Sequence, residues 1–417
     1  MVQRGRHRRR RRGRAVRAFL AGTALALTAA ATMISASQAT VSADPGAVKP
    51  LATAAETDVL RLHERLEPRS TLDRLAAGMG RPQGVRAVLA DADHRLRDAA
   101  DCSPADHEAL PVEPAATRAY CFDEADTRSW RAGAVTTSGD ADDDGLWGQD
   151  RVILSAWTEG SRGLARVAFI DATDQDRLTY SWVLLAVPVE GGRDFRALGS
   201  EVSGMVWYQD KLLVTAGDGL YVYDMNRVQR ATVDAPQVGR VDGGWAAHGD
   251  RWVLPAVGSY RAGATHPDYL SLDRSTSPDS LVASDWVSED DDRAVRLWRY
   301  DFAAGSDRTG LLATDPRGYT RVDEAYETAA PGVGAVLSYR ANWYLARATD
   351  DDGGPGTLWR QNATGAEATE CGTDETTRCW SSGTESLSYS EATGEVWSQA
   401  GRTLFALPLR SIDGSLG

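Results

Sequence analysis

The sequence predicts a mainly β fold: a β-propeller-like domain of five or six blades, preceded by a short helical N-terminal segment. Short apolar stretches with a period of two alternate with turns containing glycine and aspartate. Strand–turn–strand units recur along the chain. Apart from Phe19, all Phe, Trp and Tyr residues lie between Tyr120 and Phe405, which separates two regions of different composition. A two-sheet β-sandwich is the alternative, because the repeat spacing is irregular.

Residues 1–43 are expected to be a secretory signal peptide. Nine arginines and no acidic residue accompany a short run of small and apolar residues from Ala18 to Ile34. Small residues then allow cleavage after Ala39 or Ala43. This order defines a secretory signal, whereas a spanning helix needs about 20 strongly apolar residues. We therefore expect a secreted, extracellular protein without stable membrane insertion, and the pattern leaves the general and twin-arginine export routes open.

Charge and cysteine content agree with this location. The chain has 59 acidic and 46 basic residues, a net charge of −13. Nucleic acid is not an expected partner, because phosphate binding needs clustered Lys and Arg. Cys102, Cys121, Cys371 and Cys379 form an even set, which indicates two disulfides in an oxidising compartment. Pairing between sequence neighbours is the simplest of three connectivities, and the rival zinc site lacks a suitable ligand spacing.

Residues 44–118 are expected to form helices and a proline-containing linker. Apolar spacing and capping residues give three helical candidates: residues 58–66, 70–76 and 85–96. We expect this segment to pack against the larger domain, residues 119–417.

Ten stretches within residues 119–417 have the pattern of strands. No long helical pattern interrupts them, so parallel crossovers are not expected. The stretches are Arg151–Trp157, Leu164–Asp171, Tyr180–Pro188, Lys211–Thr215, Leu220–Asp224, Arg251–Val257, Ala294–Phe302, Asn342–Ala346, Glu395–Gln399 and Thr403–Leu407.

Five repeat units share one order: a small residue, an apolar strand, a polar turn and a second apolar strand. They begin at Gly133, Gly204, Gly244, Gly334 and Glu385. The gap between Tyr260 and Pro331 is long enough for a sixth. A single blade cannot bury both of its faces, so several must pack radially.

Six short motifs carry a resemblance to a known group of proteins. They are the stretch from Trp130 through Val135-Thr-Thr-Ser-Gly-Asp-Ala, then Gly204-Met-Val-Trp-Tyr, Gly219-Leu-Tyr-Val-Tyr-Asp, Tyr269-Leu-Ser-Leu-Asp-Arg-Ser, Pro278-Asp-Ser-Leu-Val and Trp343-Tyr-Leu. In these motifs the chain resembles uncharacterised secreted proteins of high-GC Gram-positive bacteria with β-propeller-like repeats. The resemblance covers most of residues 120–410 and implies a secreted propeller, but it assigns no catalytic residue.

The acidic stretch Asp140-Ala-Asp142-Asp-Asp144-Gly145 is the sharpest local signal. Alternating carboxylates that end in glycine offer several hard oxygen ligands to one ion, as Ca²⁺ prefers. An EF-hand is excluded, because Arg151 stands where a bidentate Glu belongs. A solvated acidic turn is the other interpretation. Calcium is therefore the one cofactor suggested, with Asp140, Asp142 and Asp144 as ligands.

No complete catalytic template is present, so the sequence assigns no catalytic residue. The Gly-x-Ser-x-Gly elbow is missing. His248 and His266 fall in predicted turns, where each is a candidate base or a surface residue. The pairs Trp207-Tyr208 and Trp343-Tyr344 either pack in the sheets or present one ring to a flat ligand.

These observations predict an extracellular propeller-type binding or surface module for a glycan or small ligand. The alternative is a hydrolase or lyase acting on an extracellular glycan through carboxylates at the channel mouth. A cluster of acidic, His and Arg side chains there would favour the enzyme, and a neutral mouth would favour binding. The fold alone does not decide, because propellers host many functions.

Overall fold

The computed structural model describes residues 44–417, except 289–290, 292, 349–353 and 385. Its regular structure is mainly β, as predicted. The expected signal peptide, residues 1–43, lies outside the described residues. None of the helices within the described part is long and apolar enough to cross a membrane.

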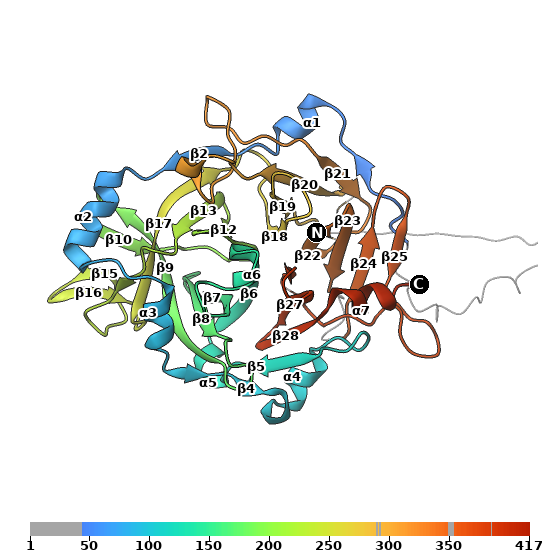
Figure 1. Ribbon diagram of the computed structural model, residues 1–417, viewed down its shortest axis with the longest axis horizontal. Coiled ribbons are helices and arrows are strands. Elements are labelled where there is room, and N and C mark those ends of the chain that lie inside the picture. Colours follow the sequence, from blue (N-terminus) through green and yellow to red (C-terminus); the bar gives the residue numbers. More distant parts are fainter. Residues whose placement is uncertain (1–43, 289–290, 292, 349–353, 385) are drawn as a thin grey trace, which may run out of the picture. The chain divides into compact units, whose positions relative to one another are not determined.

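Within the described residues the strands form five antiparallel meanders of four strands each, set around a common centre (Figure 1). The first contains β6 (Trp130–Thr137), β7 (Val152–Glu159), β8 (Ala165–Asp171) and β9 (Thr179–Val189). The second contains β11 (Met205–Tyr208), β12 (Lys211–Ala216), β13 (Gly219–Asp224) and β17 (Trp252–Arg261). The third contains β18 (Tyr269–Asp273), β19 (Ser280–Ser284), β20 (Val295–Asp301) and β21 (Ala325–Thr328). The fourth contains β22 (Val333–Tyr339), β23 (Asn342–Arg347), β24 (Thr357–Gln361) and β25 (Ala366–Ala368). The fifth contains β26 (Ser388–Ser390), β27 (Glu395–Ala400), β28 (Thr403–Pro408) and β5 (Arg118–Cys121).

Buried apolar clusters lie between neighbouring meanders and complete a cycle. Each cluster takes residues from two meanders, represented by Val167 with Trp207, Leu213 with Trp298, Leu297 with Trp343, Tyr344 with Phe405, and Trp397 with Ile153. The last cluster joins the fifth meander to the first. Each sheet is therefore covered on both faces, which explains why its strands carry apolar residues on both sides. This arrangement is propeller-like and excludes the two-sheet sandwich.

The strand predictions agree well with the structure. Each of the ten predicted strands overlaps an observed strand. Four predicted repeat units begin at or near the first strand of a meander: β6, β11, β22 and β26. The unit at Gly244 is wrong, because β16 (Gly244–Ala247) pairs with β15 (Val238–Val241) in a separate two-stranded sheet. The gap between Tyr260 and Pro331 instead contains the third meander.

The chain from residue 44 to residue 127 follows the outer edges of the meanders (Figure 1). Four short strands pair with outer strands: β1 (Lys49–Pro50) with β21, β2 (His63–Leu66) with β17, β3 (His94–Arg95) with β9, and β4 (Arg97–Asp98) with β5. Three helices lie between these strands: α1 (Ala54–Asp58), α2 (Arg69–Met79) and α3 (Val85–Ala90). Between β4 and β5 lie η1 (Ala99–Asp101) and α4 (Pro104–Glu108), and α5 (Glu124–Thr127) follows β5. This outer segment pairs edge strands that would otherwise expose backbone hydrogen-bonding groups.

Two of the three helical predictions correspond to α2 and α3, although α2 begins after Pro68 without a side-chain cap. The predicted continuation of the latter helix to residue 96 is wrong, because α3 ends at Ala90 and His94–Arg95 pair with β9 as β3. The predicted helix over residues 58–66 is wrong. Helix α1 ends at Asp58, and the following chain becomes extended in β2. Leu60 and Leu62 are buried between the second and third meanders, so tertiary packing and pairing with β17 override the local spacing.

The remaining elements modify the edges and loops. Strands β10 (Asp194–Ala197) and β14 (Gln229–Arg230) extend the sheets through β9 and β17. The other short helices are α6 (Ser138–Ala141), η2 (Ser306–Arg308) and α7 (Leu409–Gly414). Strands β9 and β17 also pair in parallel, which joins the first two meanders into one sheet. The expectation that the sheets would lack parallel crossovers is therefore wrong at this edge.

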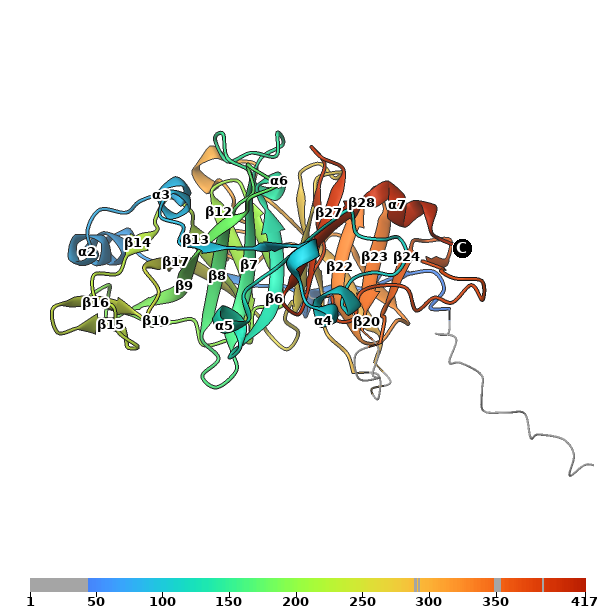
Figure 2. The same cartoon turned by 90° about the horizontal axis from the view of Figure 1, so that it is seen from below.

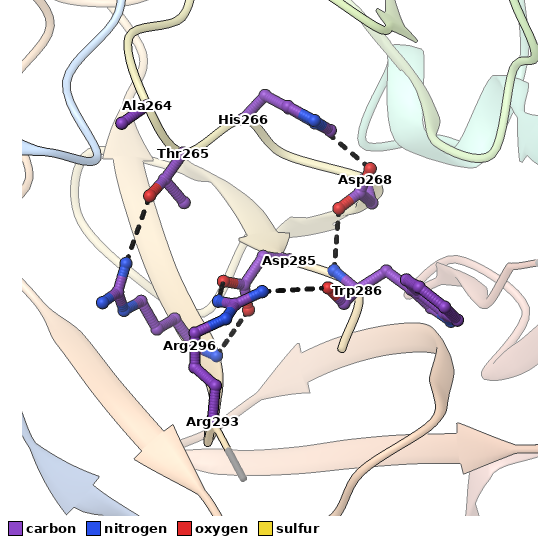
Figure 3. Close-up of a pocket in the computed structure, with 8 residues that line it drawn as sticks. All are labelled: Ala264, Thr265, His266, Asp268, Asp285, Trp286, Arg293 and Arg296. Carbon is purple, nitrogen blue, oxygen red and sulfur yellow. Dashed lines mark hydrogen bonds and ion pairs between the residues drawn. The ribbon is translucent and has the colours of Figure 1, made fainter. Parts of the chain in front are cut away.

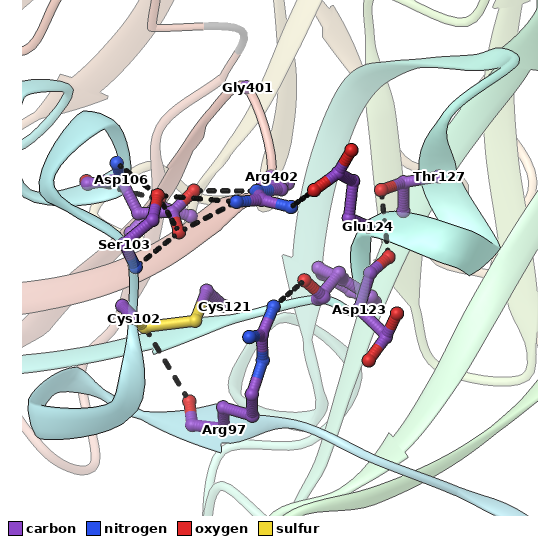
Figure 4. A network of polar contacts seen from close by, with 12 residues as sticks. Arg97, Cys102, Ser103, Asp106, Cys121, Asp123, Glu124, Thr127, Gly401 and Arg402 are labelled. Carbon is purple, nitrogen blue, oxygen red and sulfur yellow. Dashed lines mark hydrogen bonds and ion pairs between the residues drawn. A yellow bond between two sulfur atoms is a disulfide. The ribbon is translucent and has the colours of Figure 1, made fainter.

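The fifth meander combines the last strands of the chain with β5, which precedes the first meander in the sequence. Cys121 in β5 lies opposite Thr403 in β28 and is bonded to Cys102 (Figure 4). Beside them, Arg402 donates through Nε to Asp106 at 2.7 Å. Cys371 and Cys379 form the second disulfide, so both sequence-neighbour pairings are confirmed.

Candidate functional site

Trp286 is the most exposed aromatic residue of the β-sheet loops, with 51% of its surface accessible. Large aromatic side chains in proteins are usually well buried. Trp286 lies between two hollows, of about 410 and 330 Å³, and lines both together with Asp268. An exposed indole between two polar hollows suits a ligand that has both an apolar face and polar groups.

Loops at one face of the sheets build both hollows. The first is lined by residues 264–268, between β17 and β18, and by residues from the β19–β20 connection. The second adds residues 200–203 before β11 and residues 215–217 around the β12–β13 turn. Antiparallel strands bring these connections to the same end of the meanders. Figure 2 shows the upright strands with loops at two opposite faces, and α6 marks the other face.

Asp268 links the two sides of the first hollow (Figure 3). Its Oδ1 lies 3.1 Å from Nδ1 of His266, and its Oδ2 accepts a hydrogen bond of 2.7 Å from the backbone N–H of Trp286. Burial raises the pKa of the Asp268 carboxyl group, and the Trp286 N–H and His266 oppose this shift. Asp268 thus positions both the imidazole and the loop that carries the indole.

Asp285 braces the opposite wall of the same hollow. It is buried and accepts hydrogen bonds from the Arg293 guanidinium and, at 2.7 Å, from the backbone N–H of Arg296. Arg293 also donates through Nη2 to the carbonyl oxygen of Trp286 at 3.2 Å. The Arg296 side chain donates to Oγ1 of Thr265 at 3.1 Å. These contacts connect the β19–β20 loop to the chain before β18.

The second hollow is lined mainly by uncharged residues, together with the two carboxylates of Glu201 and Asp268. Ser203 donates through Oγ to the carbonyl oxygen of Asp268 at 2.7 Å, and the backbone N–H of Gly217 donates to Oγ of Ser200 at 3.0 Å. Glycine at position 204 lets the chain before β11 pack closely against Thr215 and Leu270. A Cβ atom there would lie 2.7 Å from the Thr215 methyl group and 2.8 Å from Leu270. The lining therefore offers hydroxyl and backbone groups beside the indole.

The structure does not bring the three predicted calcium ligands together. Asp140 is buried in α6, and its Oδ2 accepts hydrogen bonds from Thr136 at 2.6 Å and Ser388 at 2.7 Å. Asp144 instead accepts the backbone N–H of Leu146 at 2.8 Å. The carboxylates of Asp140, Asp142 and Asp144 are not all within 4.8 Å of one another. Calcium binding by this loop stays a prediction.

Within the described ranges, one group of three potential metal-ligand side chains does converge: Cys102, Asp106 and Cys121. Its two sulfur atoms are joined in a disulfide, so they are not available as thiolate ligands. Asp106 is paired with Arg402, whose hydrogen bonds, together with those of Ser103, lower the pKa of the carboxyl group against the opposing effect of burial. This group is structural.

The structure separates the other candidates from the sequence. His266 lines the first hollow, whereas Nδ1 of His248 lies 2.9 Å from the carbonyl oxygen of Pro236. The pairs Trp207-Tyr208 and Trp343-Tyr344 are buried, so they pack in the sheets and do not form a rim. The sequence did not single out Trp286 or Asp268. The only available signal was that both follow or precede strand-like stretches.

Comparison with known proteins does not assign this chain to a family. No family model matches the chain, and no curated protein is similar to it in sequence. A solved structure of Drosophila Plexin A in complex with Semaphorin 1b is similar over 62% of this chain and 74% of that chain, with 10% identity and a TM-score of 0.21. A similarity this weak carries no argument, so the description of the fold depends on strand pairing and buried clusters.

Proposed function

We propose that the protein is a secreted extracellular binding module on a five-bladed propeller, in which each meander is one blade. The two disulfides and the expected signal peptide support an extracellular location. The two hollows on either side of Trp286 are the proposed ligand site. The exposed indole, fixed through its backbone by Asp268, is the observation that carries this proposal.

The chemistry of the lining favours a carbohydrate. An indole stacks on the apolar face of a sugar ring, while hydroxyl, carboxylate and guanidinium groups bond to the ring substituents. Trp286 supplies the apolar face, and Ser200, Ser203, Asp268 and Arg296 surround it. Loops from more than one blade contribute, so an intact ring is needed to assemble the site.

Titration of the purified secreted protein with neutral hexasaccharides, followed by tryptophan fluorescence and calorimetry, tests the proposal. We expect Trp286→Ala to weaken binding at least 10-fold and to leave the melting temperature unchanged, because half of the side chain is already exposed. Val112→Ala is the matched control, since Val112 is 57% exposed and lies outside both hollows. Equal affinity of wild type and Trp286→Ala would refute the assignment.

A glycan hydrolase or lyase is the second candidate, favoured by one observation. The first hollow contains two carboxylates, Asp268 and Asp285, together with His266 and two arginines. The pKa of Asp268 is raised by burial, whereas Asp285 forms an ion pair with Arg293. Enzymes that cleave glycosidic bonds typically use two carboxyl groups in contrasting environments. One group acts as the general acid, and the other acts as an ionised carboxylate. Release of reducing ends by the wild type, lost in Asp268→Asn while binding persists, would establish the enzyme.

A further inference from the structure

A third hollow, of about 490 Å³, extends the ligand face away from Trp286. It shares Ala264 with the first hollow, just as the first shares Asp268 and Trp286 with the second. Residues from β2, from the end of β17 and from the loop over residues 315–319 line it. The three hollows therefore follow one another in a row, which suits an elongated ligand.

Arginine dominates the charged lining of the third hollow. The four arginines are Arg61, Arg65, Arg261 and Arg317. Asp315 lies 2.6 Å from the guanidinium of Arg61, and Asp218 pairs with Arg261. In the part of the chain that the structure describes, no carboxylate lies within 4.0 Å of the guanidinium group of Arg65 or Arg317. Asp58 also lines the hollow and lies 3.6 Å from Nη1 of Arg61. Among the described residues, therefore, neither lining carboxylate forms an ion pair with the guanidinium group of Arg65 or Arg317.

The arginines of this edge also act on one another. Burial, followed by the positive charges of Arg65 and Arg196, lowers the pKa of Arg261. Although the whole chain has 59 acidic side chains, those near this cluster do not fully compensate the positive charge of its arginines. An anion bound between the guanidinium groups would remove the repulsion and accept charge-assisted hydrogen bonds.

Tyr319 gives the third hollow an exposed aromatic surface. It is 41% exposed, its ring centre lies 4.8 Å from that of His63, and the Arg61 guanidinium lies 5.1 Å from it. Among the described residues, five large hydrophobic side chains are exposed, and three of them line the row of hollows: Val59, Trp286 and Tyr319. Aromatic surface and positive charge therefore coincide along one row.

We propose that the third hollow binds the carboxylate or sulfate groups of an acidic glycan whose neighbouring sugar rings contact Tyr319 and Trp286. The contact with Trp286 depends on the proposed function, whereas the anion contacts of Arg65 and Arg317 do not. The whole chain has a net charge of −13, and loss of the nine arginines in residues 1–43 makes the secreted form more acidic still. It therefore repels polyanions at long range, so attraction comes from the local cluster and decreases as salt screens it.

Two matched pairs of probes test this inference by calorimetry at low and at 0.3 M salt. One pair is hexagalacturonate and its carboxyl-reduced counterpart, and the other is a heparin hexasaccharide and its desulfated counterpart. We expect at least one acidic member to bind 10-fold or more tightly than its partner at low salt. Arg65→Ser with Arg317→Ser should remove that preference. Arg81→Ser with Arg86→Ser, two exposed residues outside the hollow, makes the same change of net charge and should leave it intact.

The outcomes separate this inference from the proposed function. If acidic and neutral partners bind equally and Trp286→Ala weakens both, the acidic preference is refuted and the Trp286 site stands. If the preference requires Arg65 and Arg317 but Trp286→Ala has no effect, the anion site stands and the Trp286 site is refuted. Equal weakening by both double variants shows unspecific charge attraction and refutes the inference, as does absence of binding.

Discussion

The guanidinium carbon of Arg166 lies 3.6 Å from the ring centre of Trp182, and the Trp130 ring covers its other side at 3.8 Å. Arg166 is buried and donates through Nη2 to the carbonyl oxygen of Asp126 at 2.6 Å. Its Nη1 also lies 3.5 Å from Oδ1 of Asp250. A planar guanidinium can stack on two rings and bond at its edge at once, which an ammonium group cannot do.

Replacement of Arg166 by lysine should therefore be strongly destabilising. We expect Arg166→Lys to lower the free energy of unfolding by roughly 2–4 kcal/mol, because stacking and the buried bonds are lost together. Thermal and urea unfolding measure the change. Arg131→Lys serves as control, since the Arg131 side chain is 64% exposed, and its effect should stay within about 0.5 kcal/mol. Similar effects of the two variants would contradict this role.

Asp250 should make stability depend on pH. Burial raises its pKa from 3.8 to about 6, although Arg166 and His248 oppose the shift. The folded state therefore binds the proton more tightly than the unfolded state. The stabilisation is fully present below about pH 4 and is lost as the pH rises through 6. Relative to Asp250→Asn, we expect the wild type to lose about 2–3 kcal/mol between pH 4 and 7. A difference that stays constant across this range would show that Asp250 does not titrate there.

The disulfide beside the strand pair β5–β28 should stabilise more than the other one. Cys102 and Cys121 are separated by 19 residues, and Cys371 and Cys379 by 8. The larger closed loop removes more entropy from the unfolded chain, which corresponds to a stabilisation of about 3.2 kcal/mol against about 2.5 kcal/mol. Paired Cys→Ser variants, compared by thermal melting under non-reducing conditions, measure both. A larger loss on removing Cys371–Cys379 would contradict the expectation.

Asp140 should stabilise the ring whether or not calcium is present. Its carboxylate accepts hydrogen bonds from Thr136 in the first meander and Ser388 in the fifth. We expect Asp140→Ala to lower the melting temperature equally in EDTA and in excess Ca²⁺, because those bonds need no ion. Asp144→Ala is the control, since Asp144 is exposed. A rise with Ca²⁺ that Asp142→Ala abolishes would instead support the calcium site predicted from the sequence.

Local patterns predicted most strands but not their places in the ring. Apolar runs such as those of β7, β12 and β28 indicate buried strands wherever they pack. The Gly244 unit has the same local pattern as a first strand, yet it forms a peripheral hairpin, because only tertiary contacts decide which strand lies innermost. The short strands β1 and β2 gave no signal, since edge pairing through backbone groups places few demands on side chains.

The face that carries the three hollows was harder to predict for a physical reason. His266, Trp286 and Tyr319 belong to separate loops, and no spacing rule connects residues that meet only after the meanders pack. The predicted acidic stretch was conspicuous in sequence, but its three carboxylates do not converge on one point in the structure. Asp140 is buried and accepts side-chain hydrogen bonds, whereas Asp144 accepts a backbone N–H. Aspartate side chains are usually exposed and tryptophan side chains usually buried. The burial of Asp140 and the exposure of Trp286 therefore could not be predicted from residue type.

Because β5 pairs with β28, the fifth sheet cannot form until the chain has been synthesised as far as β28. A chain truncated before Thr403 has no strand to place against Arg118–Cys121. It also lacks Leu404, Phe405 and Ala406, which pack in the apolar clusters on the two sides of the fifth meander. Such a product exposes unpaired backbone groups and apolar surface, which favour aggregation and proteolysis. Pairing of β28 with β5 buries both, so the fifth meander is complete only when residues 403–408 are present.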